Sequence, residues 1–175
     1  MKRIFCTFLL SIFCFLFSIF ITAVYAASPL LYFSGPSSDI PTGSEFSVVV
    51  LLDSPEPLNA YSISTSYPES MLEVTGWRSG SSIIDVWKDQ PVAKNGKIEF
   101  SGGSTSPFHG KSGELATINF KAVKEGRAEL DFSSVSTYAA DGKGTKITPV
   151  TKNIGFSVRN GAAPLGSFSG ADKKA

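Results

Sequence analysis

Cysteine and histidine are scarce in this sequence, and each shortage excludes a class of chemistry. The chain has two cysteines, Cys6 and Cys14, and both lie in an apolar segment near its beginning. The rest of the chain therefore has no disulfide and no thiol chemistry, and its stability must come from packing. The single histidine, His109, lies in a stretch rich in Gly and Ser, which favours a solvated loop residue over an acid–base catalyst.

Charge of one sign is also lacking. The sequence has 16 Lys and Arg against 15 Asp and Glu, and without Lys2 and Arg3 fourteen basic residues remain, which leaves a formal charge near −1. No polybasic run is present, so nucleic acid is not an expected partner. The acidic residues of the predicted strands occupy outward positions, where charges are normally solvated: Glu99, Glu114, Glu129 and Asp131.

No cofactor or metal is expected. The segment Asp141-Gly142-Lys143-Gly144 has one carboxylate where a calcium loop presents several, so it is interpreted as a hairpin turn. A phosphate-binding Gly-rich loop requires a helix behind it, and no stretch has convincing helical periodicity. Together with the absence of a catalytic pair or activated nucleophile, these observations predict that the protein is not an enzyme.

The first 26 residues have the layout of a secretory signal. Lys2 and Arg3 precede an apolar run from Ile4 to Val24, and Ala26 ends the segment with a small residue. The run is also long enough to cross a bilayer, which takes about 20 residues, so an uncleaved anchor is the alternative. Both interpretations predict a secreted or cell-surface protein whose contact with a membrane is confined to this segment.

Period-two alternation of apolar residues dominates the chain from Ser44 onward and predicts strands buried on one side. Turn signals rich in Gly, Pro and Asn separate these strands, which favours a two-sheet β-sandwich. We expect an all-β, jelly-roll-like sandwich of about nine strands over residues 28–159. Its predicted core consists of the inward positions Phe46, Val48, Val50, Tyr61, Ile63, Leu72, Val74, Ile98, Phe100, Ile118, Phe120, Leu130 and Phe156.

The segments between the strands carry further expectations. Ser54–Pro57 contains two prolines and is predicted to be a connection. A strand is expected at Ser81–Trp87, a polar segment at Asp89–Asn95 that ends in the Asn95-Gly96 turn, and a long surface loop at Gly102–Gly113. Residues 160–175 are mostly Gly, Ala, Ser and Lys and are interpreted as a flexible tail or linker.

Three pieces of the sequence resemble the cohesin domain, the receptor module of cellulosomes. Leu58–Val74 is similar to the cohesin segment in which a strand ends in Tyr-Asp-Pro before Leu-Glu and an aliphatic residue, with Tyr67-Pro68-Glu69 here in place of Tyr-Asp-Pro. Gly113–Val123 is similar to that family's Gly-x-Leu-Ala-Thr-Ile-x-Phe strand. Pro41-Thr42-Gly43 precedes a strand as it does in cohesins.

The resemblance implies a jelly-roll sandwich related to bacterial carbohydrate-binding modules, and a non-catalytic role in holding a dockerin or another protein on a flat sheet face. Dockerin-binding cohesins carry acidic or polar side chains on the outward row of the Leu58–Tyr67 strand, where this chain has Ala60, Ser62, Ser64 and Ser66. We therefore expect weak or no binding to generic dockerins, and a partner of a different kind. The predicted partner-binding residues are Ala60, Ser62, Ser64, Trp87, Glu99 and Ser101.

Two alternative functions remain open at the level of sequence. Planar aromatic rings bind sugars well because they bury a large area at a small entropic cost, and Trp77, Trp87 and Tyr138 are candidates for a polysaccharide-binding surface. The other alternative is a structural stalk or adhesin domain displayed near the membrane.

Overall fold

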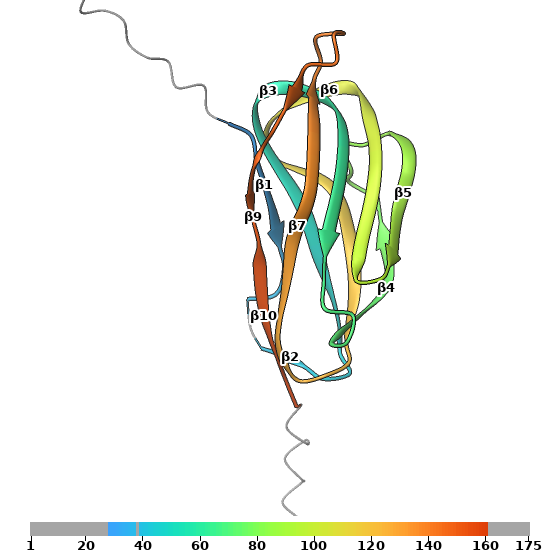
Figure 1. Ribbon diagram of the computed structural model, residues 1–175, viewed down its shortest axis with the longest axis vertical. Helices are drawn as coiled ribbons and strands as arrows, with labels where there is room; N and C mark the ends of the chain where they lie inside the picture. The colour runs from blue at the N-terminus through green and yellow to red at the C-terminus, as the bar shows by residue number, and fades with distance from the viewer. Residues whose placement is uncertain (1–27, 38, 161–175) are drawn as a thin grey trace, which may run out of the picture.

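The computed structural model describes residues 28–37 and 39–160, and in this part the chain is all β (Figure 1). The predicted signal or anchor at 1–26 and the tail beyond residue 160 lie outside the described residues. Within them, no helix has the length and apolar character needed to cross a membrane. The described strands are β1 Leu30–Ser34, β2 Ile40–Pro41, β3 Glu45–Ser66, β4 Leu72–Arg78, β5 Val86–Lys94, β6 Lys97–Ala122, β7 Gly126–Ala139, β8 Lys146–Ile147, β9 Val150–Lys152 and β10 Ile154–Arg159.

Two long strands, β3 and β6, run antiparallel and bend over together, so that each contributes to both layers of a sandwich (Figure 1). Residues 45–54 of β3 pair with β1 and with residues 110–121 of β6. Residues 58–66 of β3 pair with residues 97–108 of β6 and with β7. The register shifts between Ser54 and Leu58 mark the bend, because Pro55 and Pro57 have no N–H to give to a ladder.

This bend defines two sheets. One contains β5, residues 97–103 of β6, residues 58–66 of β3 and residues 131–139 of β7, and is called the serine sheet below. The other contains β4, residues 110–122 of β6, residues 45–54 of β3, β1 and β9, and is called the opposite sheet. The described chain enters near the end at which β3 and β6 bend, and leaves at the other end (Figure 1).

The core between the sheets is formed by the inward rows of both. Eleven of the thirteen predicted core residues are buried, with exposed fractions of 3% or less. The other two, Phe46 and Val74, are only half-buried, although both pack against the core. Phe46 stacks on Phe120 at 5.6 Å between ring centroids, and Val74 lies on β4, at an edge of its sheet.

The two sides of the sandwich are closed in different ways. On one side the chain itself closes the gap, since β9 pairs with β1 and the following β10 pairs with β7. On the other side, where β4 and β5 are edge strands, the rings of Trp77 and Trp87 meet at 5.3 Å between centroids. Both tryptophans are half-buried and pack against the core, so they seal this rim.

Three segment predictions were wrong. The strand expected at Ser81–Trp87 is shifted to Val86–Lys94, and the predicted polar segment after Asp89 is therefore most of an edge strand. The Asn95-Gly96 turn is confirmed, with φ of 53° and 70° as a tight hairpin requires. Gly102–Gly113 is not a free loop but the bent part of β6, because its residues pair with β3 at Ala60, Leu58 and Ser54.

Candidate functional site

The outer face of the serine sheet carries four rows of side chains, which the strand register defines. An apolar row consists of Val86, Gly103, Ala60 and Tyr138. The next two rows consist of Asp89, Ser101, Ser62 and Ser136, and of Val92, Glu99, Ser64 and Ser134. A charged row at the far end consists of Lys94, Lys97, Ser66 and Asp131.

These rows are outward because each alternates with a buried one. Tyr61 and Thr137, which lie between the first two rows, are 2% and 0% exposed, and burial raises the pKa of the Tyr61 phenol. Its hydroxyl donates to the carbonyl of Leu58 at 2.9 Å, so the phenol is satisfied within the core. The face is therefore built on a rigid floor whose own polar groups need no partner.

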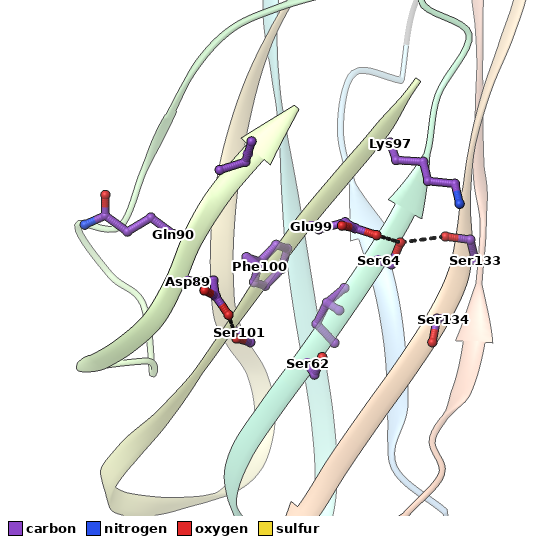
Figure 2. A pocket seen from close by; sticks show the side chains of 12 residues that line it. Ser62, Ser64, Asp89, Gln90, Lys97, Glu99, Phe100, Ser101, Ser133 and Ser134 are labelled. Atoms are coloured by element: carbon purple, nitrogen blue, oxygen red, sulfur yellow. Dashed lines mark hydrogen bonds between the residues drawn. The ribbon is translucent and has the colours of Figure 1, made fainter. Parts of the chain in front are cut away.

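Serine hydroxyls hold the two carboxylates at the middle of the face (Figure 2). Ser101 donates to Asp89 Oδ2 at 2.6 Å, and Ser64 donates to Glu99 Oε1 at 3.1 Å. The Ser64 hydroxyl also lies 2.9 Å from that of Ser133. A carboxylate can accept about four hydrogen bonds, so Asp89 and Glu99 can still accept hydrogen bonds from a partner.

Two shallow hollows lie along this face and share Ser62 and Ser101. One, of about 540 Å³, is lined by the middle rows together with Gln90, Lys97 and Ser133. The other, of about 470 Å³, is lined by the apolar row and by Lys88 and the edge of Trp87. Because they share two serines, the hollows form one groove along the strands.

The structure brings the predicted partner-binding residues together. Ala60, Ser62, Ser64, Glu99 and Ser101 lie on adjacent strands of one face. Trp87 is at its edge, with its ring half-buried against Phe100 at 6.2 Å between centroids. Whether these residues bind a partner stays a prediction.

Sequence reasoning missed several residues that line the same groove: Val86, Lys88, Asp89, Gln90, Val92, Lys97, Gly103, Ser133 and Ser134. Asp89 and Gln90 were missed because β5 was placed too early in the chain. Ser133 and Ser134 are both exposed because the register shifts between Ser64 and Thr65, which breaks the alternation of β7. The Asn95-Gly96 turn, which requires a strand on each side, was a signal that could have located β5.

The aromatic residues of the carbohydrate alternative do not form one platform. Trp77 and Trp87 pack on each other with their planes at 55° and seal the rim between β4 and β5. Tyr138 lies on β7, across the sheet from them. This arrangement does not favour sugar binding through the three rings, which stays an untested prediction.

Other polar groups of the fold have structural partners. Asp85, just before β5, accepts hydrogen bonds from the backbone N–H and the hydroxyl of Thr105, which lower the pKa of its carboxyl. His109 is exposed in the bent part of β6. Among residues 28–37 and 39–160, no cluster of three or more His, Cys, Asp and Glu side chains could hold a metal ion.

Solved structures that are similar to this chain include several cohesins. A non-cellulosomal cohesin from the archaeon Archaeoglobus fulgidus matches with a TM-score of 0.62 and 20% identity, over 77% of this chain and 93% of that one. The seventh ScaB type I cohesin of Pseudobacteroides cellulosolvens matches with a TM-score of 0.65 and 21% identity, over 79% of this chain and 96% of that one. The cohesin of the Coh-OlpC–Doc435 cohesin–dockerin complex from Clostridium thermocellum matches with a TM-score of 0.65 and 14% identity, over 77% of this chain and 95% of that one.

The described part of the chain has the β-sandwich fold of these cohesins. The family model for the cohesin domain matches residues 34–158, and the chain belongs to the cohesin family. Cohesins are non-catalytic modules that bind dockerin-containing proteins. No protein with a curated description matches the chain in sequence.

Proposed function

We propose that this protein is an attachment module that holds a dockerin-like helical module of another protein on the outer face of the serine sheet. The observation that carries the proposal is the groove along this face, whose floor is formed by Ala60, Ser62, Ser101 and Gly103. Such small side chains let the backbone or a helix of a partner approach the sheet closely.

The family and the sheet chemistry support the proposal from two directions. Several similar structures are cohesin–dockerin complexes, including Coh-OlpC with Doc435 and Coh-OlpA with Doc918 from Clostridium thermocellum. On this chain, Asp89 and Glu99 are exposed acceptors held in place by serines, and held acceptors lose less entropy on binding than mobile ones.

The composition of the face argues for a partner of its own rather than a generic dockerin. The central strand presents Ala60, Ser62, Ser64 and Ser66, where dockerin-binding cohesins carry longer acidic or polar side chains. A short hydroxyl makes fewer and more distant contacts, and no Trp or Arg anchor stands at the centre of this face. We therefore expect affinities for generic dockerins to be weaker than those of the cohesins that bind them.

The test is calorimetric titration with a panel of dockerin modules, using two arginine variants. Ser62→Arg places a bulky charge at the centre of the groove, and Ser34→Arg places the same charge on an exposed serine at the end of β1, on the opposite sheet. For any dockerin that binds, Ser62→Arg should raise the Kd at least about tenfold, which is 1.4 kcal/mol, while Ser34→Arg should leave it unchanged. An unchanged Kd in a folded Ser62→Arg protein would exclude this face.

We also propose that the protein acts outside the cytoplasm, either secreted or anchored at the cell surface. The support is the sequence alone, in which two basic residues precede an apolar run and a small-residue exit at Ala26. Cell fractionation followed by N-terminal sequencing tests this. A mature protein beginning near Ala27 indicates cleavage, an intact segment in the membrane fraction indicates an anchor, and recovery from the cytosol would contradict both.

A further inference from the structure

The groove on the serine sheet changes character from one end to the other. At one end the apolar row offers Val86, which is 56% exposed, and Tyr138 on either side of Gly103 and Ala60. A Cβ on Gly103 would lie 2.9 Å from the carbonyl oxygen of Asn59, so this position of the groove floor requires glycine. This end therefore has a depression that fits an apolar side chain of a partner.

The middle of the groove carries two exposed carboxylates beside Val92, which is 62% exposed. Asp89 and Glu99 stand in neighbouring rows, and both side chains are exposed. Lys88 approaches Asp89 only to 3.9 Å, and both of these side chains are largely in water, so that ion pair contributes little. A Lys or Arg of a partner laid over these rows would meet two carboxylates that serines already hold.

The far end of the groove carries two lysines on the side of β5 and β6, with Asp131 at the β7 end of the same row. Lys94 and Lys97 are direct cross-strand partners on the hairpin closed by Asn95-Gly96, and both are exposed. Two like charges placed opposite each other favour a negative group between them. Besides a carboxylate, the C-terminal end of a helix supplies one, because its unpaired carbonyls carry a partial negative charge.

We propose that the serine sheet accepts a partner helix in one orientation, with apolar side chains in the first turn over Val86 and Tyr138, Lys or Arg in its middle over Asp89 and Glu99, and its C-terminal end over Lys94 and Lys97. This rests on the proposed function of the same face. Four rows two residues apart span about 20 Å, which a helix of about 14 residues matches. The reverse orientation would bury apolar side chains against two lysines and would leave the carbonyl end on the apolar row.

A second copy of this chain fits the face poorly. A two-fold axis across the strands would place the apolar row of one copy against Lys94 and Lys97 of the other, and a two-fold axis along the strands would place the like charges of the two copies against each other. Complementarity of charge along the groove therefore favours a different protein with a basic helix over self-association.

The experiment uses a helical peptide of about 14 residues with Leu in its first turn and Lys at two middle positions of the same face. A spin label is attached to either end of the peptide, and line broadening is recorded on the isotope-labelled protein. A label on the N-terminal end should broaden the amide signals of Gly103 and Ala60, and a label on the C-terminal end those of Lys97 and Ser66. If each label broadened the amide signals at both ends of the groove, the single orientation would be wrong and the docking face would still hold.

The remaining outcomes of the titration decide whether the peptide binds this face at all. Peptide-induced shifts that avoid the serine sheet, or no shifts at millimolar peptide, would overturn the orientation together with the proposed docking face. Shifts on this face that depend on protein concentration without any peptide would identify a second copy as the occupant.

A matched pair of variants sharpens the result. Val86→Lys should weaken the peptide at least about tenfold, because it puts a charge in the apolar row. Val150→Lys, on β9 of the opposite sheet, replaces a valine of nearly equal exposure, 57% against 56%, and should leave affinity unchanged. Equal effects of the two variants would contradict the assignment of the apolar end.

Discussion

The outer faces of the two sheets differ more than their inner faces do. Inward, both sheets present the same alternating apolar rows, with Val48, Val50 and Ile118 from one and Ile63, Phe100 and Tyr61 from the other. Outward, the opposite sheet pairs its larger polar groups with one another: Ser47 donates to Asn119 at 2.8 Å, and Thr117 donates to Glu114 at 2.6 Å.

The opposite sheet also arranges its charges symmetrically. Lys121 lies between Glu45 on β3 and Glu73 on β4 in the strand register, so this cation has an anion on both sides. In the serine sheet, Asp89 and Glu99 accept from Ser101 and Ser64, the Lys88–Asp89 contact is an exposed one at 3.9 Å, and Lys94 lies opposite Lys97. A cation that already lies between two anions has less to gain from a charged partner than two lysines that lie opposite each other.

The largest expected effect tests whether the inner faces are equivalent. Ile63→Ala on the serine sheet and Ile118→Ala on the opposite sheet remove side chains that are 2% and 3% exposed. Each should lower the free energy of unfolding by about 2–5 kcal/mol, the usual range for truncating a buried aliphatic residue. Urea denaturation measures both. A variant with unchanged stability would show that its sheet contributes less to the core than the structure indicates.

A smaller effect is expected at the rim that joins the sheets. Trp77→Ala and Trp87→Ala should each cost about 2–3 kcal/mol, below the 3–5 kcal/mol of a fully buried ring, because both rings are half-buried. The rings contact each other, so a double-mutant cycle by urea denaturation should give a coupling of about 0.5–1.5 kcal/mol. Additive losses would mean that the tryptophans act separately, each on its own sheet.

These inner rows are the part of the fold that the sequence predicts well. Alternation places Val48, Ile63 and Ile118 inward without any knowledge of pairing, since successive side chains of a strand point to opposite faces. The same alternation identified the outward serines. What it cannot show is which strands are neighbours, and the rows of the groove depend on that.

The errors occurred where backbone geometry departs from simple alternation. Strand β5 was displaced because its register against β6 shifts around Asp89, which breaks the period of two along Val86–Lys94. Gly102–Gly113 was taken for a loop because glycine and serine dominate it, although a bent strand needs small residues: a Cβ on Gly113 would lie 2.5 Å from the Phe108 ring. Asp89, Gln90 and Ser133 were missed as groove residues because the register of their strands also shifts near them.

The turns that feed the two sheets should differ in their tolerance of a side chain. Gly96, in the hairpin of the serine sheet, has φ +70°, and a Cβ there would lie 3.1 Å from the carbonyl oxygen of Tyr67. Gly43, before β3, has φ +87° and open space around it. Gly43→Ala should therefore cost only the conformational term of about 1 kcal/mol, and Gly96→Ala about 2 kcal/mol. Equal losses on thermal unfolding would show that the contact with Tyr67 relaxes freely.

The smallest expected effect compares the two flanks of the serine sheet through two aspartates whose pKa values are lowered. Before β5, the hydroxyl and the backbone N–H of Thr105 lower the pKa of Asp85. In the turn between β7 and β8, the hydroxyl of Thr145 and the N–H of Lys143 lower the pKa of Asp141. Both donors stabilise the charged carboxylate, so any contribution to stability is present above the unfolded pKa of about 3.9 and is lost as the pH falls through the folded value.

Removing one hydroxyl should affect one flank alone. In Thr105→Val the pKa of Asp85 should rise toward its ordinary value but stay lowered, because the backbone N–H still donates, and Asp141 should titrate as before. In Thr145→Val the pKa of Asp141 should rise toward its ordinary value, and Asp85 should titrate as before. Carboxyl-carbon NMR titration of both variants measures this directly. Asp85 titrating at its ordinary value in the unaltered protein would mean that Thr105 does not hold it in solution, and that the start of β5 is freer than the structure indicates.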